Sequence, residues 1–150
     1  MANKLKINPP LYLLTTDWPC WQCETKIPLV ALLAANTNEN SHDICILSNI
    51  IKLPNEILAF IQSRVPSFKY AYSKAIESYY YANTCPSCGV VQGDFFLHTE
   101  PGSPFRPLDK QEASALCIIT VPLEKTIVIK AECGAGASND MIYAHAKRIA

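Results

Sequence analysis

Two Cys-x-x-Cys pairs constrain the fold of this chain more than any other feature of its sequence. The first pair is Cys20 and Cys23, the second is Cys85 and Cys88, and residues 24–84 separate them. Two residues between cysteines allow a tight turn to direct both sulfur atoms at one point, so each pair can form one edge of a tetrahedral metal site. The sequence therefore predicts one structural zinc ion, Zn²⁺, bound by all four thiolates.

The residues around the two pairs differ in how well they suit such a turn. In the second pair, Pro86 fixes φ within the turn, and Gly89 permits the positive φ with which the chain leaves it. The first pair has Glu24 at the position of that glycine. Three other interpretations stay open: buried structural thiols, a thioredoxin-like redox pair at Cys20 and Cys23, and an iron–sulfur cluster.

Three further cysteines lie outside the pairs. Cys45 and Cys117 stand in apolar, strand-like runs, which favours small core residues, and Cys133 precedes Gly134 with nothing nearby that would activate its thiol. The chain has seven cysteines in all, an odd number, and no recognisable signal peptide. These features argue against a secreted disulfide framework.

The composition indicates an ordered chain with balanced charge. Of 150 residues, 49% are hydrophobic and 17% are charged, and 13 basic residues cancel 13 acidic ones. The apolar content together with the zero net charge excludes a disordered chain. The zero net charge also argues against a polybasic nucleic-acid binder. No apolar stretch approaches the roughly 20 residues that span a bilayer. We therefore expect a single cytoplasmic domain over residues 1–150, without a membrane segment.

Hydrophobic patterns predict an α+β fold in which an antiparallel sheet packs against about two helices. Residues 1–10 are expected to be a loosely held arm, and residues 90–98 fit neither a strand nor a helix clearly. The expected strands are 11–16, 27–34, 44–47 and 78–83, with a hairpin of 116–121 and 126–131, a polar loop at 36–43, and helices at 54–64 and 139–148.

The long separation between the two pairs predicts an interrupted zinc ribbon. A compact ribbon separates its cysteine pairs by only about 15–20 residues. Here the intervening segment carries a predicted strand, a predicted helix and the aromatic stretch 68–81. Metal binding would therefore join the first part of the chain to its middle.

Part of the sequence also resembles a known group of proteins. Residues 79–102 contain Asn-x-Cys-Pro-x-Cys-Gly followed by Gly-Asp-x-x-Leu-His-x-Glu-Pro, and Trp18 and Trp21 flank Cys20 in the first pair. This combination resembles a group of small uncharacterised bacterial proteins. The resemblance implies an interrupted zinc-ribbon-like protein, with the four paired cysteines as metal ligands, and implies no activity.

One acid–histidine cluster follows the second pair. At a spacing of four residues, Asp94 and His98 would share a helix face, with Glu100 close behind. They could serve as a general acid and base or as a second metal site. The simpler interpretation is a hydrogen-bond network that supports the loop. A four-thiolate zinc has no open coordination position, which argues against a zinc hydrolase.

Three functional hypotheses follow. We expect a protein-interaction module, in which Trp18 and Trp21 could anchor a partner protein. The alternative is a nucleic-acid binder, because residues 68–74 interleave aromatic and basic side chains, although no stretch concentrates positive charge. The third hypothesis is an enzyme that uses Asp94, His98 and Glu100.

Overall fold

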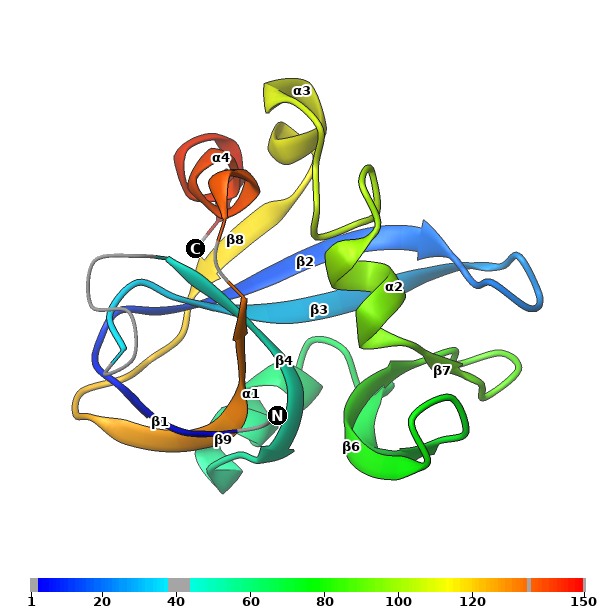
Figure 1. The fold of residues 1–150 in the computed structure, drawn as a ribbon, viewed down its shortest axis with the longest axis horizontal. Coiled ribbons are helices and arrows are strands. Elements are labelled where there is room, and N and C mark those ends of the chain that lie inside the picture. The colour runs from blue at the N-terminus through cyan, green and yellow to red at the C-terminus, as the bar shows by residue number, and fades with distance from the viewer. Residues whose placement is uncertain (1–2, 38–43, 135, 150) are drawn as a thin grey trace.

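The computed structural model describes residues 3–37, 44–134 and 136–149, and it confirms the α+β class. In these residues a ten-stranded sheet is combined with four helices (Figure 1). The strands are β1 (Asn3–Ile7), β2 (Leu11–Pro19), β3 (Lys26–Ala34), β4 (Cys45–Lys52), β5 (Phe68–Ser73), β6 (Ser78–Thr84), β7 (Val91–Gln92), β8 (Cys117–Thr120), β9 (Ile127–Gly134) and β10 (Lys147–Ile149). The helices are α1 (Asn55–Gln62), α2 (Asp94–Thr99), α3 (Lys110–Ser114) and α4 (Ala137–His145).

The sheet has one main path and one branch. The main path runs β1-β9-β4-β3-β2-β8-β10, and β6 leaves it at β4, carrying β5 and β7 beside it. All pairs are antiparallel except β8 and β10, which are parallel. The branch brings the residues just before the second cysteine pair beside the central strands.

β3 is buried on both of its faces. Val30 and Leu32 pack into one core with residues of α1, while Leu29 and Leu33 pack into a second core with residues of α2, α3 and α4. A strand that is covered on both faces carries a continuous apolar run instead of an alternating one. This explains why residues 27–34 are almost uninterruptedly apolar.

Most of the expected elements are confirmed. The strands at 11–16, 27–34, 44–47 and 78–83 are β2, β3, β4 and β6, and the helix at 54–64 is α1. The ambiguous segment 90–98 divides into β7 and the start of α2. Most of the polar loop at 36–43, including His42, lies outside the described residues. No helix in the described part of the chain is long and apolar enough to cross a bilayer.

The expectation of a loosely held arm is wrong for residues 3–7. They form β1, which pairs along its whole length with β9, and Leu5 and Ile7 are fully buried. Exposed Lys4 and Lys6 alternate with these two residues. This alternation of buried and exposed residues has the period of two that a half-buried strand requires. It is too short to be recognised as a strand from the sequence alone.

The expected hairpin of 116–121 and 126–131 is also wrong. β8 pairs with β2 and β10, whereas β9 pairs with β1 and β4, so the two strands lie near opposite ends of the main path. Strands that are adjacent in sequence pair only about two-thirds of the time, because distant strands compete for the same edges. The final helix is shorter than expected, since α4 ends at His145 and residues 147–149 form β10.

Two of the remaining cysteines form a disulfide. Cys45 of β4 and Cys133 of β9 are joined, with their Cα atoms 5.4 Å apart. Leu47 lies directly opposite Cys133, so the two cysteines are diagonal neighbours on adjacent strands. Cys45 is a buried core residue, as its apolar run predicted, but its bond to Cys133 was not predicted from the sequence. Cys117 is free and partly buried at the start of β8.

Candidate metal centre

The two cysteine pairs meet at one point. We call residues 20–25 the first knuckle and residues 85–90 the second knuckle. The four Sγ atoms all lie within 4.8 Å of one another. Between the pairs, the Sγ atoms of Cys20 and Cys88 are 3.6 Å apart, as are those of Cys23 and Cys85. A tetrahedral zinc with Zn–S bonds of about 2.3 Å separates its sulfur atoms by about 3.8 Å. This cluster could therefore hold a metal ion.

Both knuckles use the same backbone turn. The N–H of Glu24 donates to the carbonyl of Cys20 at 3.0 Å, and the N–H of Gly89 donates to the carbonyl of Cys85 at 2.8 Å. Glu24 and Gly89 both have positive φ, 63° and 82°. Glu24 thus adopts a backbone conformation that favours glycine, at a cost of about 1 kcal/mol.

Gln92 of β7, just after the second knuckle, supports the sulfur cluster. Its side chain is buried, its Nε2 donates to the Sγ of Cys20 at 3.4 Å, and its Oε1 accepts from the N–H of Trp21 at 3.4 Å. The N–H of Gln22 also donates to Cys20 Sγ at 3.4 Å. Such contacts orient sulfur ligands and offset their negative charge. Gln92 was not predicted to be part of the site, because its only signal in the sequence is its position shortly after Cys88.

The thiols of Cys20 and Cys88 differ widely in pKa. Burial raises the pKa of the Cys20 thiol, but hydrogen bonds from backbone amides of the turn and from Gln92 lower it to about 6. For Cys88, a backbone N–H lowers the pKa, while burial and the three neighbouring thiols raise it to about 12. Without a cation, the neighbouring thiols thus hinder the ionisation of Cys88. A bound divalent ion removes this effect, because thiols that coordinate a metal are deprotonated.

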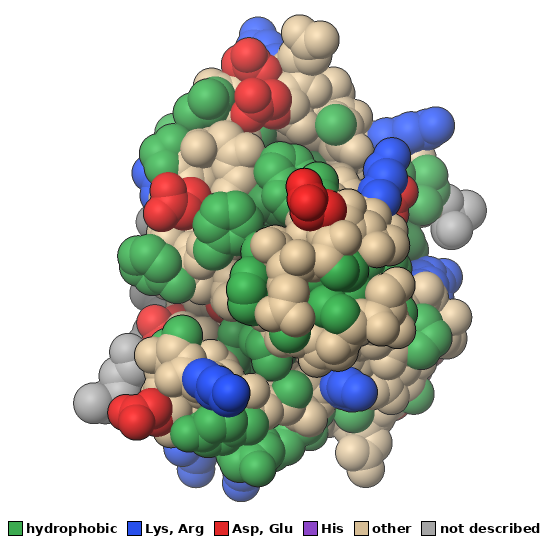
Figure 2. Space-filling model, turned by 90° about the vertical axis from the view of Figure 1, so that its right-hand side faces the viewer, with side chains coloured by type: hydrophobic (Ala, Val, Ile, Leu, Met, Phe, Trp, Pro, Cys, Tyr) green, Lys and Arg blue, Asp and Glu red, His purple; other side chains and the backbone are tan. Residues whose placement is uncertain are grey.

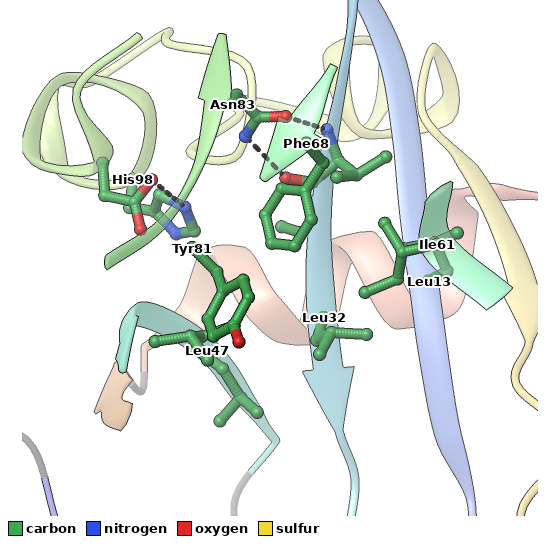
Figure 3. Close-up of a pocket in the computed structure, with 12 residues that line it drawn as sticks. Leu13, Leu32, Leu47, Ile61, Phe68, Tyr81, Asn83 and His98 are labelled. Atoms are coloured by element: carbon green, nitrogen blue, oxygen red, sulfur yellow. Dashed lines mark hydrogen bonds and ion pairs between the residues drawn. The ribbon is translucent and has the colours of Figure 1, made fainter. Parts of the chain in front are cut away.

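Asn83 joins the second knuckle to the central sheet. Its Oδ1 accepts from the N–H of Val30, and its Nδ2 donates to the carbonyl of Val30, both at 2.9 Å (Figure 3). β4 pairs with β3 only at residues 32–34, so the backbone of Val30 lies beyond that ladder. One side chain thus supplies the two hydrogen bonds that a neighbouring strand would otherwise give, and it does so two residues before Cys85.

The two tryptophans of the first knuckle region have different environments. Trp18 is partly buried and packs against the second core. Trp21 is 61% exposed, and its Nε1 donates to the carbonyl of Val91 at 2.8 Å. Trp21 therefore connects the first knuckle to β7 through its indole nitrogen while it presents most of its ring to solvent.

The structure brings together two members of the acid–histidine cluster. The Nε2 of His98 lies 4.0 Å from Oδ1 of Asp94, and both side chains are about nine-tenths buried (Figure 3). Burial raises the pKa of Asp94 to about 7, although a hydrogen bond from the Asn49 N–H lowers it and the charge of Glu132 adds to the rise. Burial lowers the pKa of His98 to about 4. Glu100 is exposed beyond the end of α2, and it is not part of the lining of the cavities that His98 lines.

Comparisons of the chain with protein-family models, with curated proteins and with solved structures each found no match. The candidate metal centre therefore stands on the geometry of its four sulfur atoms and their N–H donors.

Proposed function

We propose that this chain is a zinc-stabilised protein-interaction module, in which one structural zinc ion supports a groove for an apolar segment of a partner protein. The metal ligands in this proposal are Cys20, Cys23, Cys85 and Cys88. Four thiolates fill the tetrahedral coordination of zinc and leave no open position, so the ion serves the fold. The observation that carries the proposal is an apolar groove of about 680 Å³ beside the two knuckles.

Aromatic side chains dominate the wall of this groove. Trp21 of the first knuckle, Tyr72 of the β5–β6 hairpin and Phe96 of α2 are 61%, 46% and 46% exposed. Figure 2 views the molecule from this end and shows hydrophobic side chains at its surface. Clusters of large exposed apolar side chains mark interaction sites, and aromatic anchors supply much of the binding energy at protein interfaces.

The lining also indicates the chemistry of the partner segment. Among the described residues that line the groove, Lys74 alone is charged. We infer that the partner contributes an aromatic or branched apolar side chain to the groove and an acidic side chain to Lys74. The volume of the groove suits a few side chains of a peptide segment.

The proposed metal and the groove are directly connected. Trp21 lies between Cys20 and Cys23, and the wall at Gly89 and Val91 begins immediately after Cys88. Because both walls are attached to ligands of the same ion, the position of the aromatic wall depends on the ion. Removal of the metal should therefore weaken partner binding as well as the fold.

A peptide library displayed on phage and selected against the zinc-loaded protein tests this proposal. We expect enriched peptides that contain an aromatic and an acidic residue, with affinities measured by fluorescence anisotropy. Trp21→Ser and Phe96→Ser should each weaken binding at least about tenfold, because each removes an aromatic wall. Val128→Ser is the matched control, since Val128 is 49% exposed on β9 outside the groove. Absence of enrichment, or peptides that bind both groove variants as tightly as the wild type, would contradict the proposal.

The outer face of the β5–β6 hairpin favours a second candidate, the binding of single-stranded nucleic acid. Tyr70, Tyr72 and Tyr79 are exposed there, and Lys69 and Lys74 lie on the same hairpin. However, the rings of Tyr70 and Tyr79 stack on each other with centroids 5.5 Å apart, which occupies one face of each ring. Retention on immobilised single-stranded DNA that falls steeply with salt would favour this candidate, and no retention at low salt would exclude it.

A further inference from the structure

A second cavity, of about 420 Å³, lies between α2, the segment 100–108 and the start of α4. It shares no lining residue with the groove of the proposed function. Its lining includes His98, Arg106, Ser138 and Asn139. The cavity is therefore a separate feature, built from residues of 98–108, of β4 and of 134–141.

His98 contributes a buried polar group to this cavity. Its side chain is only 10% exposed, and its ring packs against Phe105 with centroids 5.3 Å apart. The contact of 4.0 Å with Asp94 is too long for a hydrogen bond. Within the described residues, neither ring nitrogen of His98 makes a hydrogen bond. Burial lowers the pKa of His98 to about 4, so at neutral pH the ring is uncharged and carries one N–H that can be donated.

Arg106 and the N-terminus of α4 bring positive charge to the same cavity, and no negatively charged residue in the described lining balances it. Arg106 is exposed at its rim, and no described residue forms an ion pair with the guanidinium. α4 begins at Ala137 after Gly136, and no side chain caps its first N–H groups. The N-terminus of a helix carries a partial positive charge. None of the described lining residues is acidic, and Asp140 in the first turn of α4 is exposed outside the lining.

We propose that this cavity is a binding site for a small molecule that carries a carboxylate or phosphate group. The guanidinium of Arg106 and the first N–H groups of α4 hold the oxyanion, and the imidazole of His98 donates a further hydrogen bond from the wall. The volume lies within the range of small-molecule sites. A charged side chain, a helix N-terminus and a buried donor at one cavity together match the chemistry of oxyanion recognition.

Titration of the ¹⁵N-labelled protein with inorganic phosphate and, separately, with acetate tests this site at constant ionic strength. We expect saturable shifts of the amide signals of Ala137 and Ser138. Arg106→Gln should weaken binding about tenfold or more, because it removes a charge-assisted hydrogen bond. Lys110→Gln removes a positive charge from α3 outside the lining and should leave the affinity unchanged. Saturation by phosphate alone or by acetate alone identifies which oxyanion the site takes.

A second variant tests the site by filling it. Ser138→Asp places a carboxylate at the start of α4, where it should abolish phosphate and acetate binding while the melting temperature stays equal or rises. Ser78→Asp adds the same charge at an exposed position of β6 and should leave binding intact. Linear, non-saturating shifts with both anions, or equal affinity in the wild type and in Arg106→Gln, would overturn the proposal.

Discussion

The single buried side chain of Asn83 joins β6 to β3. It binds both backbone groups of Val30, at 2.9 Å each, and its own side chain is buried. Asn83→Leu should lower the free energy of unfolding by about 2–4 kcal/mol, because it leaves a buried N–H and a buried carbonyl without partners. Urea denaturation measures this change. Asn55→Leu, at the exposed start of α1, should change stability by no more than about 0.5 kcal/mol. Equal effects of the two substitutions would contradict the role of Asn83.

Asp94 gives the stability of the protein a specific dependence on pH. Burial raises its pKa to about 7 in the folded state, above the ordinary value of 3.8. The folded state therefore binds this proton more tightly than the unfolded state does. The stabilisation by the protonated carboxyl is fully present below about pH 4, falls as the pH rises, and is lost above about pH 7.

Asp94→Asn should remove this dependence, because the amide stays neutral and its oxygen can still accept from the N–H of Asn49. At pH 8 the variant should be more stable than the wild type by about 4 kcal/mol, and the difference should vanish near pH 4. Chemical denaturation at a series of pH values gives the two curves. Asp17→Asn, at an exposed position, serves as the control. Curves for Asp94→Asn and the wild type that remain parallel would show that the buried carboxyl does not titrate in this range.

At the residue scale, the four candidate metal ligands could be predicted from the sequence, but the residues that support them could not. The spacing within each cysteine pair is a local property, so Cys20, Cys23, Cys85 and Cys88 could be predicted to act together. Gln92 could not be found in the same way, because its function depends on contact with a sulfur atom 72 residues away. The pairing of Asp94 with His98 was predictable from their helical spacing, whereas the exposure of Glu100 depended on where α2 ends.

At the scale of elements, the loss of one thiol from either knuckle should disrupt metal binding and lower the stability of the fold. Cys23→Ser and Cys88→Ser should each lose the proposed zinc, because three thiolates hold the ion less tightly and structural zinc contributes directly to folding. We expect the melting temperature to fall by about 10 °C or more. Elemental analysis together with thermal denaturation checks both effects. Cys117→Ser removes a thiol outside the cluster and should retain one zinc per chain. Stoichiometric zinc in both knuckle variants would contradict the assignment of the ligands.

The elements themselves were predictable to different degrees. β2 and β3 stood out because their apolar runs are long and both lie in the middle of the sheet. The absence of a β8–β9 hairpin was not predictable, since both edges of β9 are taken by β1 and β4, which lie far away in sequence. The short α3 was not expected either, although Asp109 caps it by accepting from the N–H of Glu112 at 2.9 Å.

At the scale of the whole molecule, the disulfide and the four-cysteine cluster each bring together distant parts of the chain. The Cys45–Cys133 disulfide closes a sequence separation of 88 residues. Cys45→Ala/Cys133→Ala should lower the free energy of unfolding by about 2–4 kcal/mol, because a long loop gains freedom in the unfolded state. The same variant should keep its full metal content, since neither cysteine belongs to the sulfur cluster.

Counting thiols tests the disulfide directly. Alkylation of the denatured, metal-free protein without reductant should modify five cysteines, and alkylation after reduction should modify all seven. Mass spectrometry of the two samples resolves the difference. Seven modified cysteines in both samples would show that Cys45 and Cys133 are not joined.

The place of β9 between β1 and β4 has a consequence for synthesis on the ribosome. A growing chain has all four sulfur ligands once Cys88 has emerged, well before residues 127–134 exist. Before β9 has been synthesised, β1 and one edge of β4 have no pairing partner, because β9 lies between them and pairs with both. Nascent chains that stall in this interval therefore carry all four thiols of the candidate metal centre together with open strand edges, and such edges are the surfaces at which incomplete chains aggregate.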